Sequence, residues 1–346
     1  MRILHIVGSF LNGGIETLLV NVANRQSQDG HEVGIIFITN RIAKELVSEI
    51  DSSVKTYYVN KPVGSKNPYF LLRLNYFYRR FCPQILHLHG SNFTNLLLGK
   101  CTGEKRFVTL HNNVIKIYYS KSVDQYIAIS ECVRASFVRQ TGMQNCTVCY
   151  NGITLENFVT KTEYREKPQK IVCVGRVLFG VKGQDILIDA LTRLKSQGYS
   201  LACDFYGTGS DYELLKHLIE KNNLQASVKA LGNIPNEYLA KHLHEYDLAV
   251  QASRHEGLGI SAIETMACGV PTILSAVDGF LEVSKNGQYA MLFANESAAE
   301  LCDKLISAIE HYDTCIILAK DAKNYVDASF SILKMVSELD TIYTSV

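Results

Sequence analysis

The sequence predicts an α/β protein of two domains, each with a mostly parallel sheet covered by helices on both faces. The chain has 346 residues, which is more than one α/β core usually holds. Short apolar runs alternate with helix-length amphipathic segments, as expected of βαβ units. This alternation occurs twice, once on each side of a single polar stretch.

The first alternation opens with a βαβ unit. An apolar run at 2–10 is closed by glycine and serine, a helical pattern covers 16–28, and a strand-like run follows at 31–39. Further strand-like runs lie at 84–90, 106–112, 125–130 and 147–152, separated by helix-length segments. This arrangement predicts a doubly wound parallel sheet that ends near Gly152.

Residues 153–168 are polar and end in Pro168, which is typical of a linker between domains. We place the N-terminal domain at 1–160 and the C-terminal domain at 161–327. In the second domain, strand-like runs lie at 170–176, 201–209, 228–233, 248–253 and 271–275, and helical patterns at 184–198, 211–223, 236–246 and 260–269.

The tail from Ser297 to Val346 is almost entirely helical in pattern. Its helices either cap the second sheet or cross back to the first. In the second case residues 328–346 join the N-terminal domain.

Charge is distributed unevenly along the chain. Residues 1–160 carry a net charge of +7 and the remainder −6. A basic half can face an anionic membrane or acceptor, although such asymmetry also arises without function. The sequence predicts no nucleic-acid partner.

The ten cysteines are scattered through strand-like and helical runs, and no leader pattern precedes the first strand. We therefore expect a reduced, cytoplasmic protein. Cys146 and Cys149 are three apart in a strand-like run, so their side chains should face opposite sides and share neither a metal nor a disulfide. No apolar run approaches the roughly 18 to 20 residues that cross a bilayer, so any membrane contact must be peripheral.

Two strand-to-helix loops could hold a phosphate. In the first, Gly13 and Gly14 lead directly into a helix, whose free N–H groups suit an anion. Glycines are also needed in many tight turns, so this signal is weak by itself. In the second, VGRVLFGVKGQD places Arg176 and Lys182 six residues apart. Two cations there can neutralise a diphosphate without a metal, unless both are merely solvated surface charges.

The segment SRHEGLGISAIETMACGVP carries Glu256 and Glu264. Gly257 and Gly259 place Glu256 on a loop, with a helix beginning near Ser261. One interpretation is structural, since Ser261 and Glu264 then form an S-x-x-E capping box. The other is functional: N–H groups of Leu258, Gly259, Ile260 and Ser261 meet a phosphate, Glu264 accepts from ribose hydroxyls and Glu256 binds a sugar. Both interpretations stay open on the residues alone.

The run EGLGISAIETMACGVP resembles the EGxGxxxxEAMAxGxPV signature of glycosyltransferase family 4, whose members are retaining enzymes of the GT-B fold. In that fold two Rossmann-like domains face each other across a cleft. The resemblance extends over nearly the whole chain, because GGIET, TLHN, AISE, YNGI, VGR with KG, FYGTGSD, LGN and DGFLE occur in the family's order.

The resemblance implies that Glu264 binds the ribose and Glu256 the donor sugar, with Arg176 and Lys182 on the diphosphate. Gly14, beside Gly13, would approach the β-phosphate. His111 in TLHN matches the histidine that lies beside the donor sugar.

Two departures from the family pattern weaken the inference. Asparagine follows His111 where an acidic residue is common, and DGF stands where the family often has two glycines. Glu282 therefore either binds the nucleotide or caps a turn. His87 and His89 match no ligand role and are interpreted as structural.

The implied reaction transfers a sugar from a nucleotide-sugar donor to a hydroxyl group of a glycan or lipid-linked acceptor, with retention of configuration. The resemblance points to cell-surface polysaccharide or glycolipid assembly. We see no nucleophile beside a base and no cluster of acidic residues or histidines that would hold a metal, so we expect no cofactor. Two alternatives remain: an isomerase or phosphorylase of the same fold, and a non-catalytic sugar-nucleotide-binding partner.

Residues 68–83, PYFLLRLNYFYRRFCP, interleave Arg73, Arg79 and Arg80 with large apolar and aromatic side chains. This mixture suits a helix at an anionic membrane surface. The alternative is a helix that covers the sheet with Leu71, Leu74, Tyr78 and Phe81 and turns its arginines to solvent.

Overall fold

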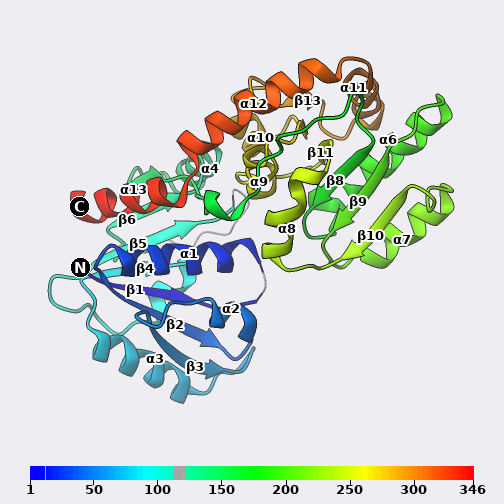
Figure 1. Cartoon of the computed structure of the whole chain (residues 1–346). Coiled ribbons are helices and arrows are strands. Elements are labelled where there is room, and N and C mark those ends of the chain that lie inside the picture. The colour runs from blue at the N-terminus through cyan, green and yellow to red at the C-terminus, as the bar shows by residue number, and fades with distance from the viewer. Residues whose placement is uncertain (12, 113–119, 121) are drawn as a thin grey trace. The chain divides into compact units, whose positions relative to one another are not determined.

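The computed structural model describes residues 1–11, 13–112, 120 and 122–346. Two compact units make up the chain. The first comprises Met1–Ile153 together with Ile332–Val346, and the second comprises Thr154–Ser331. The C-terminal segment therefore crosses back to the first unit, as one of the two alternatives for the tail predicts (Figure 1).

The first unit contains a seven-stranded parallel sheet in the order β3-β2-β1-β4-β5-β6-β7. Its strands are β1 Arg2–Val7, β2 Glu32–Thr39, β3 Lys55–Lys61, β4 Ile85–Leu88, β5 Lys105–Leu110, β6 Gln125–Ala128 and β7 Cys146–Val148. The sequence analysis did not identify β3. This strand lies at the sheet edge and buries only one of its seven residues fully, so it lacks the continuous apolar run of a central parallel strand.

The helical segments of the first unit are α1 Gly14–Gln28, α2 Lys44–Ser48, α3 Pro68–Phe81, η1 Ser91–Leu96, α4 Glu131–Thr141 and α13 Ile332–Ser345. Side-chain caps fix two of their starts. The Asn67 side chain accepts from the Tyr69 N–H at the start of α3, where Pro68 is the first helical residue. The Ser130 side chain accepts from the Val133 N–H at the start of α4.

Helix α13 completes the core of the first unit. Met335, Val336 and Leu339 are buried in one cluster with Leu18 and Val22 of α1 and with residues of the four strands β1, β4, β5 and β6. In Figure 1, α13 accordingly lies along the first sheet, far in sequence from the strands it covers. The amphipathic pattern of the tail is explained by this burial.

The second unit contains a six-stranded parallel sheet in the order β10-β9-β8-β11-β12-β13. Its strands are β8 Lys170–Val174, β9 Ala202–Tyr206, β10 Val228–Gly232, β11 Leu248–Gln251, β12 Thr272–Ser275 and β13 Met291–Phe293. The sequence analysis did not identify β13, which has three residues and only one that is fully buried. So short a run carries no recognisable period.

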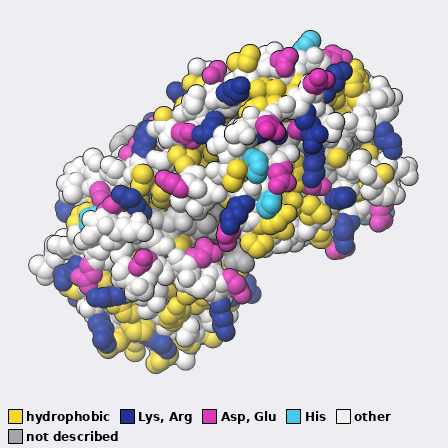
Figure 2. Space-filling view, in the orientation of Figure 1, with side chains coloured by type: hydrophobic (Ala, Val, Ile, Leu, Met, Phe, Trp, Pro, Cys, Tyr) yellow, Lys and Arg dark blue, Asp and Glu magenta, His cyan; other side chains and the backbone are white. Residues whose placement is uncertain are grey.

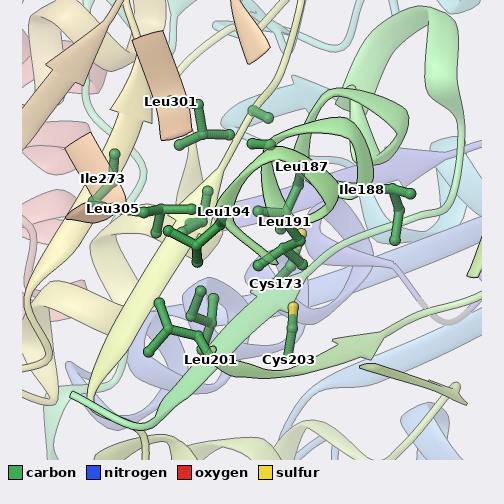
Figure 3. Packing of buried hydrophobic residues seen from close by; sticks show 14 of the residues in the cluster. Cys173, Leu187, Ile188, Leu191, Leu194, Leu201, Cys203, Ile273, Leu301 and Leu305 are labelled. Atoms are coloured by element: carbon green, nitrogen blue, oxygen red, sulfur yellow. The ribbon is translucent and has the colours of Figure 1, made fainter. Parts of the chain in front are cut away.

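The helical segments of the second unit are η2 Leu155–Asn157, α5 Phe179–Lys182, α6 Gln184–Ser196, α7 Tyr212–Lys221, α8 Asn236–His242, η3 Leu243–Glu245, α9 Ile260–Ala267, α10 Asp278–Val283, α11 Ala298–Glu310 and α12 Tyr312–Ser329. Side chains of α6 and α11 pack with side chains of the strands in one buried cluster, part of which Figure 3 shows. Leu191 and Leu194 of α6 meet Leu305 of α11 above Cys173 and Cys203 of the strands.

The polar segment before β8 packs against the second unit. The Val159 N–H donates to the Ala240 carbonyl at 3.1 Å, and the Lys161 N–H donates to the Cys268 carbonyl at 2.8 Å. The Lys161 ammonium is buried and lies 3.5 Å from an oxygen of Asp247. Backbone hydrogen bonds and one buried ion pair thus hold this segment in place despite its polar composition.

All ten cysteines are free thiols. Cys146 is on β7 and Cys149 follows it, and burial raises the pKa of Cys146 to about 12. Within the part of the chain that the structure describes, no helix has the length and apolar character needed to span a membrane.

Candidate active site

Each sheet has one point where the strand order reverses. In the first sheet β1 lies between β2 and β4, and in the second β8 lies between β9 and β11. The loops after the two central strands leave in opposite directions there, and ligands of doubly wound sheets bind beside such a point. The predicted site residues follow these strands: Gly13 follows β1, Arg176 and Lys182 follow β8, and Glu256 follows β11.

In the second unit, backbone contacts join the loops after β8 and β11. The N–H groups of Arg254 and His255 donate to the Val181 carbonyl at 2.8 and 3.2 Å. Gly183 has a φ of +62°, and a Cβ at this position would lie 2.0 Å from the Ala252 carbonyl oxygen. Only glycine permits so close an approach.

Arg254 reinforces the same junction. Its two terminal nitrogens each lie 2.8 Å from a carboxylate oxygen of Asp185 on α6, and one also donates to the Phe179 carbonyl at 2.5 Å. A bidentate guanidinium–carboxylate pair is geometrically specific. Arg254 therefore fixes the β11 loop to the start of α6.

The predicted pair of cations differs from the arrangement in the structure. Lys182 Nζ lies 2.5 Å from Glu256 Oε2, with the side chains only 22% and 13% exposed. Ser253 Oγ lies 3.3 Å from the same oxygen. Arg176 is exposed, and its side chain makes no hydrogen bond or ion pair with any described residue. The structure thus brings Lys182 to Glu256 and leaves the Arg176 guanidinium in solvent.

The predicted capping box of Ser261 and Glu264 is wrong. Helix α9 begins at Ile260, its N-cap is Gly259, and no side chain caps it. Ser261 is the second helical residue, two positions after the N-cap. The N-cap position has a φ of +101°, which glycine adopts readily and residues with a Cβ, such as serine, rarely adopt. The N–H groups of Leu258, Gly259, Ile260 and Ser261 donate no hydrogen bond to any residue that the structure describes.

Glu264 therefore has no structural partner at the helix start. Its side chain is half-buried on α9, and it forms no hydrogen bond or ion pair within the described ranges. Burial raises the pKa of its carboxyl group to about 7. A poorly solvated carboxylate without a donor can accept hydrogen bonds from a ligand.

Helix α10 packs against the loop that carries Glu256. A Cβ at Gly279 would lie 2.7 Å from the Glu256 carbonyl oxygen, so the second position of DGF requires glycine. The first position, where this chain has Asp278 instead of the glycine common in the family, begins α10. Glu282 is half-buried on the same helix.

In the first unit, Gly13 is the N-cap of α1 and Gly14 is its first residue. A Cβ at Gly13 would lie 2.6 Å from a carboxylate oxygen of Glu16. As a glycine, the N-cap residue offers no side chain that could cap the helix. Backbone N–H groups at the start of a 15-residue helix favour an anion.

A row of histidines lies at the reversal point of the first sheet. His5 of β1 and His87 of β4 are register partners, so their side chains share one face of the sheet. His89 and His111 follow β4 and β5 and belong to the same face by their alternation. His5 Nδ1 lies 3.1 Å from His89 Nε2, and His89 Nδ1 lies 3.4 Å from His111 Nε2.

His87 links the row to the rest of the unit. Its Nδ1 lies 2.6 Å from the Tyr343 hydroxyl on α13, and its Nε2 lies 2.6 Å from Thr109 Oγ1 on β5. Burial lowers the pKa of His5 and of His111 to about 4, and it lowers the pKa of His87 and His89 well below the usual value. All four rings are therefore neutral at pH 7.

Ligand nitrogens of His5, His87 and His89 all lie within 4.8 Å of one another, which is close enough for a metal ion. Every ring nitrogen of these three residues is already hydrogen-bonded. The sequence analysis missed this cluster. Its signal was present in LHI, HLH and TLH at the ends of three strands, but only the strand order shows that these strands are neighbours.

Two family models match the chain. One, described as Glycosyltransferase Family 4, matches residues 12–157, and the other, described as Glycosyl transferases group 1, matches residues 156–325. The chain is 26% identical over 261 residues to an uncharacterized glycosyltransferase of Methanocaldococcus jannaschii, covering 75% of this chain and 68% of that protein. It is 25% identical over 306 residues to the GPI3 subunit of phosphatidylinositol N-acetylglucosaminyltransferase from Saccharomyces cerevisiae, covering 79% and 67%.

Solved structures resemble the whole chain. Anabaena HepE in complex with UDP and glucose has a TM-score of 0.82 and 18% identity, with all of both chains covered. A glycosyltransferase of Rickettsia africae has a TM-score of 0.83 and 21% identity, with 99% and 98% covered. These likenesses establish the GT-B fold. Because the two family models together span residues 12–325, the chain belongs to glycosyltransferase family 4.

Proposed function

We propose that this glycosyltransferase uses a nucleotide-sugar donor and transfers the sugar to a hydroxyl group with retention of configuration. The observation that carries the proposal is the charged set at the reversal point of the second sheet. Lys182 and Glu256 are paired there, and Glu264 is a half-buried carboxyl group without a partner among the described residues. HepE, a protein of the same fold, has been solved with UDP and glucose and with UDP-glucose.

In the proposed roles, Lys182 and Arg176 bind the diphosphate, and Glu264 accepts hydrogen bonds from the ribose. Glu256 binds the donor sugar while it stays beside Lys182. The free N–H groups of residues 258–261 and the start of α1 at Gly13 and Gly14 offer further donors to phosphate oxygens. Glu282 on α10 is assigned to the nucleotide.

Acceleration in this proposal comes from cations that stabilise the diphosphate as negative charge develops on it. The departing diphosphate takes the proton of the acceptor hydroxyl on the same face of the sugar, so no protein nucleophile is needed. Because Arg176 and Lys182 supply the positive charge in this scheme and no metal ion is needed, we expect EDTA to leave transfer largely intact. Loss of activity in EDTA that returned with magnesium or manganese would contradict the role given to Arg176 and Lys182.

Donor binding can be tested before any acceptor is known. A melting-temperature screen against UDP, GDP, ADP and dTDP sugars should show one strong response, because a ligand at 100 times its Kd adds about 2.7 kcal/mol. Glu264→Ala should remove the response. Glu213→Ala is the matched control, since Glu213 is an exposed residue on α7 that forms an ion pair with Lys216. No response to any nucleotide sugar would contradict the proposal.

The same assay separates the alternatives. Transfer predicts that free nucleotide accumulates only when an acceptor is present. An isomerase or phosphorylase would convert the donor without a hydroxyl acceptor, and a non-catalytic partner would bind it and leave it unchanged.

The acceptor side of the proposal rests on α3. Leu74, Tyr78 and Phe81 of this helix are buried against the sheet, as the structural alternative predicts. The outer face, however, exposes Tyr69, Leu72 and Tyr76 by 54%, 63% and 56%. Figure 2 shows apolar side chains flanked by Lys and Arg side chains at the lower edge of the view, over α3.

We assign to this outer face a contact with an anionic membrane that carries a lipid-linked acceptor for glycolipid or polysaccharide assembly. Ten free thiols are consistent with the inner, cytoplasmic side. Wild-type protein should sediment with anionic liposomes at low salt. Changing Arg73, Arg79 and Arg80 to Glu, or Leu72 to Ser, should reduce sedimentation, whereas Leu214→Ser on α7, which is 48% exposed, should not. Wild-type protein in the supernatant would favour a soluble acceptor.

A further inference from the structure

A chain of hydrogen-bonded side chains runs from α1 to His111. It begins at Gln26, whose Oε1 lies 2.8 Å from His5 Nε2. His5 Nδ1 then lies 3.1 Å from His89 Nε2, and His89 Nδ1 lies 3.4 Å from His111 Nε2. Gln26 and His5 have no exposed surface. Water therefore does not compete for the first two members of the chain.

Each imidazole in the chain is neutral, because burial lowers the pKa of His5, His89 and His111. A neutral imidazole carries one N–H and one lone pair, so each ring donates through one nitrogen and accepts through the other. The tautomer of one ring then dictates the tautomer of the next.

The direction of the chain is set at Gln26. Its Oε1 can only accept, so His5 carries its proton on Nε2 and accepts at Nδ1. His89 therefore carries its proton on Nε2 and accepts at Nδ1, and His111 carries its proton on Nε2. In this orientation the Gln26 Nε2 group points away from His5 and has no hydrogen-bond partner among the described residues.

The chain ends in a lone pair at His111 Nδ1. This atom is buried and has no hydrogen-bond partner in the part of the chain that the structure describes. A buried acceptor without a donor is unfavourable, so the position is suited to a ligand that supplies a hydroxyl or N–H group.

We propose that Gln26, His5 and His89 are positioning residues that hold His111 in the Nε2–H tautomer, so that its Nδ1 accepts a hydrogen bond from a hydroxyl group of the sugar substrate. The inference rests on the proposed function. A chain of opposite direction would present an N–H group at the same atom and would select an acceptor such as a carboxylate. The Gln26 amide thus determines, through His5 and His89, whether His111 Nδ1 accepts or donates a hydrogen bond.

The tautomer of His111 can be measured directly by NMR on wild-type protein with ¹⁵N-labelled histidine, with His111→Asn to assign the signals. Nδ1 should give a pyridine-type signal and Nε2 a pyrrole-type signal between pH 6 and 8. A proton on Nδ1, or titration of His111 in this range, would overturn the proposal. So would a concerted shift of the His5, His87 and His89 nitrogens on addition of Zn²⁺, which would show a metal site instead.

Variants of Gln26 test whether this residue determines the tautomer of His111. Gln26→Met removes the acceptor, and it should give a mixture of His111 tautomers and raise the KM for the donor about tenfold with a smaller change in kcat, as expected for loss of one hydrogen bond. Gln26→Glu restores an acceptor oxygen and should recover the single tautomer. Gln140→Met on α4, an exposed position, is the matched control. An unchanged tautomer in Gln26→Met would contradict the role of Gln26.

The substrate hydroxyl is tested by titrating wild-type protein with the donor and with its deoxy analogues. The intact donor should shift the His111 Nδ1 signal, and one deoxy analogue should fail to do so. If His111 has the expected tautomer but no nucleotide sugar binds, only the proposed function is contradicted. Donor binding with His111 in the other tautomer would contradict the positioning chain alone.

Discussion

The two sheets reverse their strand order at equivalent points but line them with opposite chemistry. At β1 and β4 the first unit places neutral histidines that are hydrogen-bonded to one another and to uncharged side chains. At β8 and β11 the second unit places Lys182 and Glu256 as an ion pair, with Glu264 on the next helix. The first arrangement gives directional hydrogen bonding without charge, and the second gives charge that can meet a diphosphate.

The two sites should also change the stability of the fold in opposite directions as the pH falls. His5 and His111 have pKa values of about 4 in the folded chain against 6.5 when unfolded, so the unfolded chain binds more protons between these values. Their contribution to stability is present above pH 6.5 and is lost as the pH falls toward 4. Glu264 has a pKa of about 7 against 4.5, and its folded form gains stability as the pH falls from 7 to 4.5.

The largest expected effect is therefore acid unfolding of the first unit before the second. One pKa unit corresponds to about 1.4 kcal/mol, so each of these histidines contributes up to about 3 kcal/mol between pH 6.5 and 4. Hydrogen exchange measured by mass spectrometry at pH 7.5, 6 and 5 should show protection falling first in residues 1–153 and 332–346. His5→Asn should flatten this dependence, and the exposed His217→Asn should not. Equal loss in both units would contradict the comparison.

The next effect concerns the charged pair. Lys182→Met should lower kcat/KM about 10²- to 10³-fold, because the leaving diphosphate loses a preorganised cation and Glu256 loses its partner. Steady-state kinetics with the identified donor provides the measurement. A double-mutant cycle with Glu256→Gln should show strong coupling, whereas additive effects would mean that the ion pair seen between the two is not used in transfer. Lys216→Met on α7 is the control.

A smaller effect is expected at Glu264, where the same substitution should weaken nucleotide binding and raise the stability of the fold at high pH. Glu264→Gln should weaken nucleotide binding by about 1.5 to 3 kcal/mol, the range for hydrogen bonds to a charged group. The same variant should be more stable than wild type at pH 8 and equal to it at pH 4, because it removes a desolvated carboxylate. Calorimetric titration and melting curves at the two pH values measure both. Lost stability with normal affinity would restore a purely structural role.

The smallest effect is expected where the histidine row meets α13. Tyr343→Phe removes the hydroxyl that lies 2.6 Å from His87 Nδ1 and should lower stability by roughly 1 to 2 kcal/mol. Denaturant unfolding provides the measurement, with the exposed Tyr238→Phe as control. An unchanged stability would show that the histidine row does not help to hold α13 on the first sheet.

The periodic patterns of the sequence were sufficient for the two-domain α/β fold and for most of its strands. They failed at β3 and β13, where an edge position and a length of three residues leave no clear period. The signature around Glu256 and Glu264 identified the family, and the glycines correctly placed Glu256 on a loop. The residue roles stay predictions, because no ligand contact has yet tested them.

The sequence by itself determined which residues follow which strand, since that depends on local order along the chain. Only the tertiary structure decided which of those strand ends are neighbours. Parallel strands β1 and β4 are separated by more than 75 residues yet pair in register, and this pairing brings His5 to His89. Likewise, the structure makes Gly259, with a φ of +101°, the N-cap of α9, so that Ser261 lies inside the helix and is not its cap. Both outcomes depend on packing between distant segments, which no local pattern records.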